Sequence, residues 1–138
     1  MSKRRLETSL YTEELSNGVR VLALPMENTS TVSIVVAIRV GSRHDPPNGH
    51  GMAHLLEHMM MTTHANRPSL NSLHRELDSL GGESNAFTDK DNTMLTIEVR
   101  PQDVPRAIGI VLDIVQKMSR SFHLDWMHCL TISFAAPE

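Results

Sequence analysis

Residues 51–59 read Gly-Met-Ala-His-Leu-Leu-Glu-His-Met, and this stretch guides the interpretation of the whole chain. It is rich in good helix formers and contains no breaker after its first residue, so it predicts a helix from Gly51 to about Met61. Residues four apart lie on one helix face, one turn above the other, which places His54 beside His58. Two imidazoles in this arrangement can both reach one zinc ion at about 2.0–2.1 Å.

Glu57 lies three residues after His54 and flanks the same helix face. A carboxylate at this place can take a proton from a water molecule that zinc activates, and can so act as the general base of peptide hydrolysis. The order His-x-x-Glu-His is the inverted zinc-peptidase motif. Two histidines at this spacing are, on their own, more often ordinary surface or core residues. Whether they bind zinc therefore has to be judged from the flanking segments.

Outward from this helix, the pattern predicts strands and helices separated by turn residues. In chain order these are a turn at Asn17-Gly18, strands at 19–24 and 31–40, a helix at 69–80 stopped by Gly81-Gly82, strands at 84–88 and 93–99, and a helix beginning at Pro101. No clear period follows Ser121, and no element is predicted there.

Composition and charge exclude several classes of protein. The chain has 138 residues, enough for one modest domain, and its net charge of -3 argues against nucleic-acid and membrane partners. No apolar run resembles a signal peptide or approaches the roughly 20 residues that span a bilayer. A cytoplasmic location is therefore expected, and a mitochondrial location is left open. The single cysteine, Cys129, is expected to be a free thiol.

Four further segments agree with the motif helix in their order along the chain. Residues 15–21 read Leu-Ser-Asn-Gly-Val-Arg-Val, residues 40–45 read Val-Gly-Ser-Arg-His-Asp, residues 81–88 read Gly-Gly-Glu-Ser-Asn-Ala-Phe-Thr, and a strand follows at 93–99. With these segments, residues 8–121 resemble the pitrilysin/insulinase family (inverzincins, M16) of zinc metallopeptidases. This family includes insulin-degrading enzymes and mitochondrial processing peptidases.

The resemblance implies a fold and a set of roles. The fold would be α+β, an antiparallel-rich mixed sheet with helices packed mainly on one face, forming part of a metallopeptidase domain. His54 and His58 would bind Zn²⁺, and Glu57 would be the general base. Asn85, Ala86 and Thr88 would lie on an edge strand that pairs with an extended substrate, although they are also compatible with ordinary strand structure. The expected partners are a peptide or small unfolded polypeptide substrate and a second homologous half or subunit.

The end of the chain departs from the family pattern. A third zinc ligand, a glutamate on an acidic helix, is expected at about 133–135, where the chain has Ser133, Phe134 and Ala135. Glu138 is the only later acid and is kept as a candidate ligand, although it follows Pro137 at the end of the sequence. We therefore expect residues 1–121 to be the N-terminal part of a pitrilysin-like domain and residues 122–138 to be a divergent tail.

Three functions remain open at this stage. The first is a zinc-dependent metalloendopeptidase, and the second is a truncated, catalytically inert homologue that binds a partner half or a peptide. The third is a simple histidine-rich metal-binding protein. The remaining histidines that bear on this choice are expected to be solvated, in loops or near the site without binding metal: His44, His50, His64 and His74.

Overall fold

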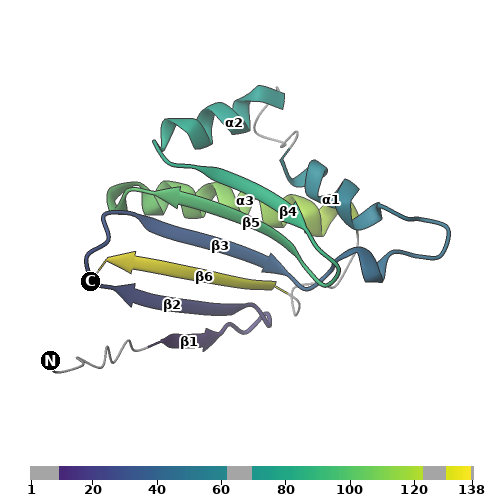
Figure 1. Ribbon diagram of the computed structural model, residues 1–138, viewed down its shortest axis with the longest axis horizontal. Coiled ribbons are helices and arrows are strands. Elements are labelled where there is room, and N and C mark those ends of the chain that lie inside the picture. The colour runs from purple at the N-terminus through teal and green to yellow at the C-terminus, as the bar shows by residue number, and fades with distance from the viewer. Residues whose placement is uncertain (1–9, 62–69, 123–129, 138) are drawn as a thin grey trace, which may run out of the picture.

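The computed structural model describes residues 10–61, 70–122 and 130–137, and shows a sheet backed by helices (Figure 1). The strands are β1 (Tyr11–Glu14), β2 (Arg20–Met26), β3 (Val32–Ile38), β4 (Ser84–Thr88), β5 (Thr93–Val99) and β6 (Leu130–Pro137). The α-helices are α1 (Met52–Met60), α2 (Leu70–Ser79) and α3 (Val104–Phe122), and short 3₁₀ helices are η1 (Ser42–His44) and η2 (Pro101–Asp103).

The described strands form one six-stranded sheet in the order β1-β2-β6-β3-β5-β4. Strands β2 and β6 run parallel, and every other neighbouring pair is antiparallel. Figure 1 shows the three α-helices gathered over one side of this sheet. The expected α+β fold, with an antiparallel-rich mixed sheet and helices on one face, is therefore confirmed.

One face of the sheet carries the core. Along β3 and β5 buried and half-buried residues alternate, as expected when one face of a strand is covered by helices and the other is not. The buried residues of the two strands lie on the same face of the sheet, because Ile34 is paired with Ile97 and Val36 with Leu95. Helices α2 and α3, with Leu80 directly after α2, complete this core with buried side chains: Leu73, Leu77, Leu80, Ala107, Ile110, Val111, Ile114 and Val115.

Strand β6 corrects the expectation that nothing regular follows Ser121. Helix α3 continues to Phe122, and residues 130–137 lie between β2 and β3 in the sheet. Ile132 is paired with Val21 on one side and Val36 on the other. These partners are distant in sequence, so no local pattern announces the pairing, and a short apolar run alone does not distinguish a strand from a helix.

Strand β1 was also missed, for a different reason. Its four residues are all exposed, so they show no apolar alternation. The strand forms because the turn at Asn17 and Gly18 folds the chain back and pairs β1 with β2. Gly18 has a φ of 84°, and the Asn17 side chain accepts a hydrogen bond from the amide of Val19 at 3.2 Å, so the predicted turn is present.

Candidate active site

Helix α1 presents the two motif histidines on its outward face. Its inward face is held in place because Ala53 and Met60 are buried beside the sheet and the other helices. His54 and His58 are exposed, and their ring centroids lie 4.6 Å apart with 41° between the ring planes. The side-by-side placement expected from the helical period is therefore found, whereas metal binding by this pair stays a prediction.

Glu57 is half-buried, and its carboxylate reaches strand β4. The hydroxyl of Thr88 donates a hydrogen bond to Oε2 of Glu57 at 2.8 Å. Behind Thr88, the buried hydroxyl of Thr93 lies at 3.4 Å and donates to the carbonyl oxygen of Val40 at 2.8 Å. One oxygen of the Glu57 carboxylate is thus held at the end of β4.

Strand β4 lies at one edge of the sheet, as the sequence predicted for Asn85, Ala86 and Thr88. One of its backbone edges pairs with β5, and its other edge pairs with no strand among the described residues. Asn85 is exposed, whereas Ala86 and Thr88 are half-buried on the helix side. An extended peptide can add to such an edge through backbone hydrogen bonds, while the Thr88 side chain is engaged by Glu57.

Asp45 is a residue of this site that the sequence analysis missed. Its carboxylate accepts hydrogen bonds from the amides of Ala53 at 2.8 Å and Gly51 at 2.7 Å, at the start of α1. Gly51 is the N-cap residue and has no side chain to fill this role, so an aspartate from the preceding loop caps the motif helix instead. Because these amides, Ala53 first, stabilise the ionised form, the pKa of Asp45 is lowered below its ordinary value of 3.8.

Replacement of Asp45 by asparagine should therefore destabilise the fold in a pH-dependent way. A lowered folded pKa means that the stabilisation is fully present above the ordinary value of 3.8 and is lost as the pH falls through the folded pKa. At pH 7 we expect Tm to fall by roughly a few degrees. In the most acidic buffers the difference from the parent chain should shrink. Thermal unfolding measured across this range checks the result.

The matched control is Glu27→Gln, which neutralises an exposed carboxylate in the loop after β2. It should leave Tm nearly unchanged, because surface substitutions away from caps and cores have small effects. A loss of Tm in Asp45→Asn that is equally large at neutral and acidic pH would show that the ionised carboxylate is not what caps α1.

The donor set for a metal ion is incomplete within the described part of the chain. No group of three or more His, Cys, Asp or Glu side chains there could hold a metal ion. Ser133, Phe134 and Ala135 lie in β6 and not on a helix, and Glu138 lies outside the described residues. Two imidazoles are the right type of ligand for zinc, but a catalytic zinc site usually has three protein ligands. The described residues therefore offer two candidate ligands, and their metal binding stays a prediction.

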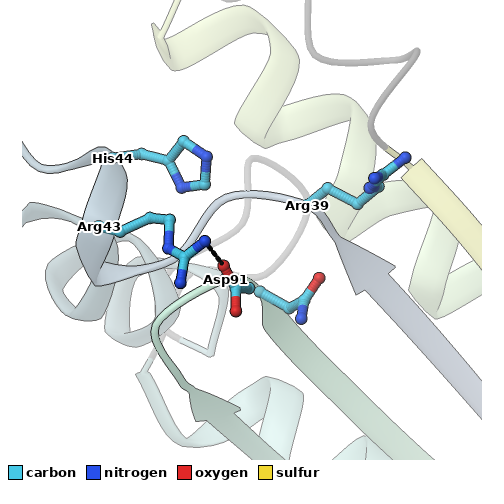
Figure 2. A pocket seen from close by; sticks show the side chains of 5 residues that line it. Arg39, Arg43, His44 and Asp91 are labelled. Atoms are coloured by element: carbon cyan, nitrogen blue, oxygen red, sulfur yellow. Dashed lines mark ion pairs between the residues drawn. The ribbon is translucent and has the colours of Figure 1, made fainter.

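A hollow of about 540 Å³ lies elsewhere, where β3 ends near the turn between β4 and β5 (Figure 2). It is lined by Arg39, Arg43, His44, Asp91 and Asn92. Arg43 and Asp91 form an ion pair at 2.7 Å with both side chains more than half exposed, an arrangement that contributes little to stability. None of the three motif residues lines this hollow, so the geometry around α1 and β4 defines the candidate site.

The remaining histidines match their expected positions where the structure describes them. His44, His50 and His74 are exposed. His44 accepts a hydrogen bond at Nδ1 from the amide of Gly41 at 3.1 Å. His64 and Cys129 lie outside the described residues. Within those residues, no helix is long and apolar enough to cross a membrane.

Comparison with known sequences assigns most of the chain to one family. The family model described as insulinase, peptidase family M16, matches residues 20–123. The β subunit of the mitochondrial-processing peptidase of Dictyostelium discoideum is 36% identical over 110 residues, covering 80% of this chain and 23% of that protein. An uncharacterized zinc protease of Rickettsia bellii is 32% identical over 111 residues, covering 80% and 27%.

A third relative is not named as a peptidase. Cytochrome b-c1 complex subunit 1 of Rattus norvegicus, a mitochondrial protein, is 34% identical over 105 residues, covering 76% of this chain and 22% of that protein. The chain thus spans about a quarter of the length of the curated relatives that it matches.

Solved structures support the same fold. A protease from Helicobacter pylori superposes with a TM-score of 0.83 at 17% identity, covering 95% of this chain and 47% of that chain. Pitrilysin superposes with a TM-score of 0.70 at 29% identity, covering 79% of this chain and 12% of that chain. The first similarity extends over nearly the whole of the chain, and at its low identity it supports the fold alone.

Proposed function

The chain belongs to the insulinase family, peptidase family M16, and from this premise we propose that it acts as part of a zinc-dependent metalloendopeptidase. One observation supports the proposal above the others. The carboxylate of Glu57 is held by Thr88 at the edge of the sheet, on the same helix as two imidazoles that lie side by side. This arrangement would place the proposed general base and the proposed zinc ligands on one helix next to a strand that could bind peptide.

His54 and His58 would be the protein ligands from this chain. Zinc, when bound, supplies a Lewis acid that polarises a peptide carbonyl and makes water a better nucleophile. Glu57 would take the proton from the attacking water and return it to the leaving amine. The hydrogen bond from Thr88 restricts rotation of the Glu57 side chain, so that the oxygen not engaged by Thr88 can be directed to the water.

Substrate would bind along β4. A peptide or small unfolded polypeptide in an extended conformation would pair with the backbone of Asn85, Ala86 and Thr88 and so add a strand to the sheet. Backbone pairing of this kind depends weakly on the substrate sequence. A second homologous half or subunit would cover the substrate from the other side. The cytoplasmic location expected from the sequence stays a prediction, and two of the compared relatives carry mitochondrial names.

The incomplete donor set favours a second candidate function. With two imidazoles and no third donor among the described side chains, the chain would bind zinc more weakly than a three-ligand site. One relative is named as a subunit of the cytochrome b-c1 complex and not as a peptidase. On this alternative the chain is a catalytically inert homologue that binds a partner half or a peptide without cleaving it.

Substitution of Glu57 by glutamine separates these functions. The purified chain with added zinc should hydrolyse an unfolded fluorogenic peptide, and Glu57→Gln should lower kcat by about a hundredfold or more because the amide cannot accept the proton. Glu98→Gln removes an exposed carboxylate on β5 and serves as the matched control that keeps activity.

Hydrolysis that survives in Glu57→Gln at the parent rate rejects the proposed general base. A parent chain that binds the peptide but does not cleave it supports the inert homologue instead. Peptide binding can be measured in the same samples by fluorescence anisotropy, so the two outcomes are distinguished directly.

A further inference from the structure

The hollow at the end of β3 has a positively charged lining that the proposed peptidase mechanism does not use. Arg39 directly follows β3, Arg43 and His44 belong to η1, and the other two lining residues, Asp91 and Asn92, lie between β4 and β5. In Figure 2 Arg39 lies to one side and Arg43 and His44 to the other, with Asp91 between them. Two arginines and one aspartate give the lining an excess of one positive charge.

The lining is also rich in hydrogen-bond donors. Arg43 shares its charge with Asp91 through their 2.7 Å ion pair, so the excess charge of the lining lies on Arg39. The Nδ1 atom of His44 accepts from the amide of Gly41 at 3.1 Å. With this hydrogen bond a neutral His44 ring carries its hydrogen on Nε2, which is then a donor like the guanidinium groups. Such a set of groups favours a negatively charged oxygen ligand.

Backbone contacts hold the two sides of the hollow together. The amide of Ser42 donates to the carbonyl oxygen of Asp89 at 3.0 Å. The amide of Arg43 donates to the carbonyl oxygen of Lys90, also at 3.0 Å. At Gly41 a Cβ atom would lie 2.6 Å from backbone atoms of residues 89, 91 and 92, so the two segments are in close contact. The backbone that carries the lining is therefore in place before a ligand arrives, which lowers the ordering cost of binding.

We propose that this hollow binds an acidic side chain of a peptide, with the carboxylate placed on the guanidinium group of Arg39. A guanidinium group can hold both oxygens of one carboxylate through two parallel N–H···O bonds. The excess of a single positive charge in the lining matches the single charge of a carboxylate. The volume of about 540 Å³ lies in the range of pockets that take small ligands, so it has room for a side chain.

The hollow is within reach of a peptide that binds along β4. The sheet order β3-β5-β4 places a strand added to β4 three strand spacings from β3, or about 14–15 Å. An extended chain covers about 3.3–3.6 Å per residue. A peptide that continues past Thr88 would therefore need about four or five residues to bring a side chain from β4 to the end of β3.

This inference rests on the peptide binding in the proposed function, and it is independent of zinc and of hydrolysis. It adds a substrate class, because backbone pairing along β4 alone would select weakly among sequences. Peptides with an acidic residue outside the paired segment would bind more tightly than their neutral counterparts.

The test measures binding of two fluorescent peptides to the whole chain by anisotropy. The peptides are unfolded, have blocked ends, and differ only in Glu or Gln at positions outside the segment that pairs with β4. A chelator is present so that neither peptide is cleaved. The Glu peptide should bind about fivefold more tightly at low ionic strength. Added salt should reduce this preference, because it screens charges that are exposed to solvent.

Arg39→Gln should remove the preference for the Glu peptide. Arg75→Gln, which removes an exposed arginine on α2, is the matched control and should keep it. Asp91→Asn removes the negative charge of the lining and should strengthen binding of the Glu peptide about two- to threefold, a gain that a merely structural role would not produce. The replaced side chains are exposed, so the variants should fold, and unchanged circular dichroism checks this.

Several outcomes overturn the inference. They are equal binding of the two peptides, no binding of either, a preference that persists in Arg39→Gln, and weaker binding of the Glu peptide by Asp91→Asn. If the zinc-loaded chain cleaves both peptides with the same KM, the inference falls and the proposed function stands. A preference that depends on Arg39 without any hydrolysis supports the inference and counts against the peptidase.

Discussion

Ile34→Ala is expected to lower the free energy of unfolding by about 2–5 kcal/mol, the range for truncation of a buried aliphatic side chain. Ile34 is fully buried in the middle of β3, with Ile97 opposite on β5 and Phe134 opposite on β6. Removal of its outer atoms leaves a cavity between the sheet and the helices, where the packed surroundings relax only in part. Because small proteins are stable by about 5–15 kcal/mol, this is a large share of the total. Urea unfolding followed by circular dichroism measures it.

The neighbouring Val35 provides the control. It is half-buried and points to the opposite face of the sheet, because successive side chains on a strand alternate. Val35→Ala should therefore cost clearly less than Ile34→Ala, with an unchanged dependence on denaturant. Equal losses at the two positions would mean that the face away from the helices is covered as fully as the core.

Gly82→Ala is the second substitution with a large expected effect. A Cβ atom at this position would lie 1.5 Å from the carbonyl oxygen of Glu98 and 2.5 Å from its carbonyl carbon. The obstacle is backbone, so no side-chain rotation relieves it, and the chain entering β4 has to move away from β5. This movement disturbs the hydrogen bond from the amide of Glu98 to the carbonyl of Glu83, now 2.8 Å. We expect a loss of about 1–3 kcal/mol or more in urea unfolding.

Gly109 offers the opposite case within the same chain. It lies in α3, and a Cβ atom there would have no neighbour within 4 Å. Gly109→Ala should leave stability unchanged or raise it by about 0.5–1 kcal/mol, because alanine is the better helix former. If Gly82→Ala were as well tolerated as Gly109→Ala, the close approach of the two strands at Glu98 would be refuted.

Elements with strong local patterns could be predicted from the sequence. Strands β4 and β5 have the predicted bounds, and α1 lies within one residue of its predicted ends. The glycine pair at Gly81 and Gly82 also ends α2 as expected, with Gly81 in the left-handed region at a φ of 72°. Strands β1 and β6 could not be predicted, because one has only exposed residues and the other is held by partners far away in the sequence.

Some features of the candidate site could likewise be predicted from the sequence, and others depend on the fold. The pairing of His54 with His58 follows from helical period alone, and the rings lie side by side. The bond between Glu57 and Thr88 joins residues 31 positions apart, and the cap that Asp45 provides depends on the path of the loop between them. The sequence placed Thr88 on the edge strand but offered no sign that its hydroxyl would hold the general base.

The sequence by itself determined the family and the helix that sets two imidazoles side by side, because both follow from residue identity at short spacing. Only the tertiary structure decided that β6 lies inside the sheet, that Glu57 turns toward β4, and that the histidines remain exposed. The physical reason is the range of the interactions. The helical period relates residues that are four positions apart. Strand pairing, burial and the hydrogen bond of Glu57 depend instead on segments that are distant in sequence and that only folding brings together.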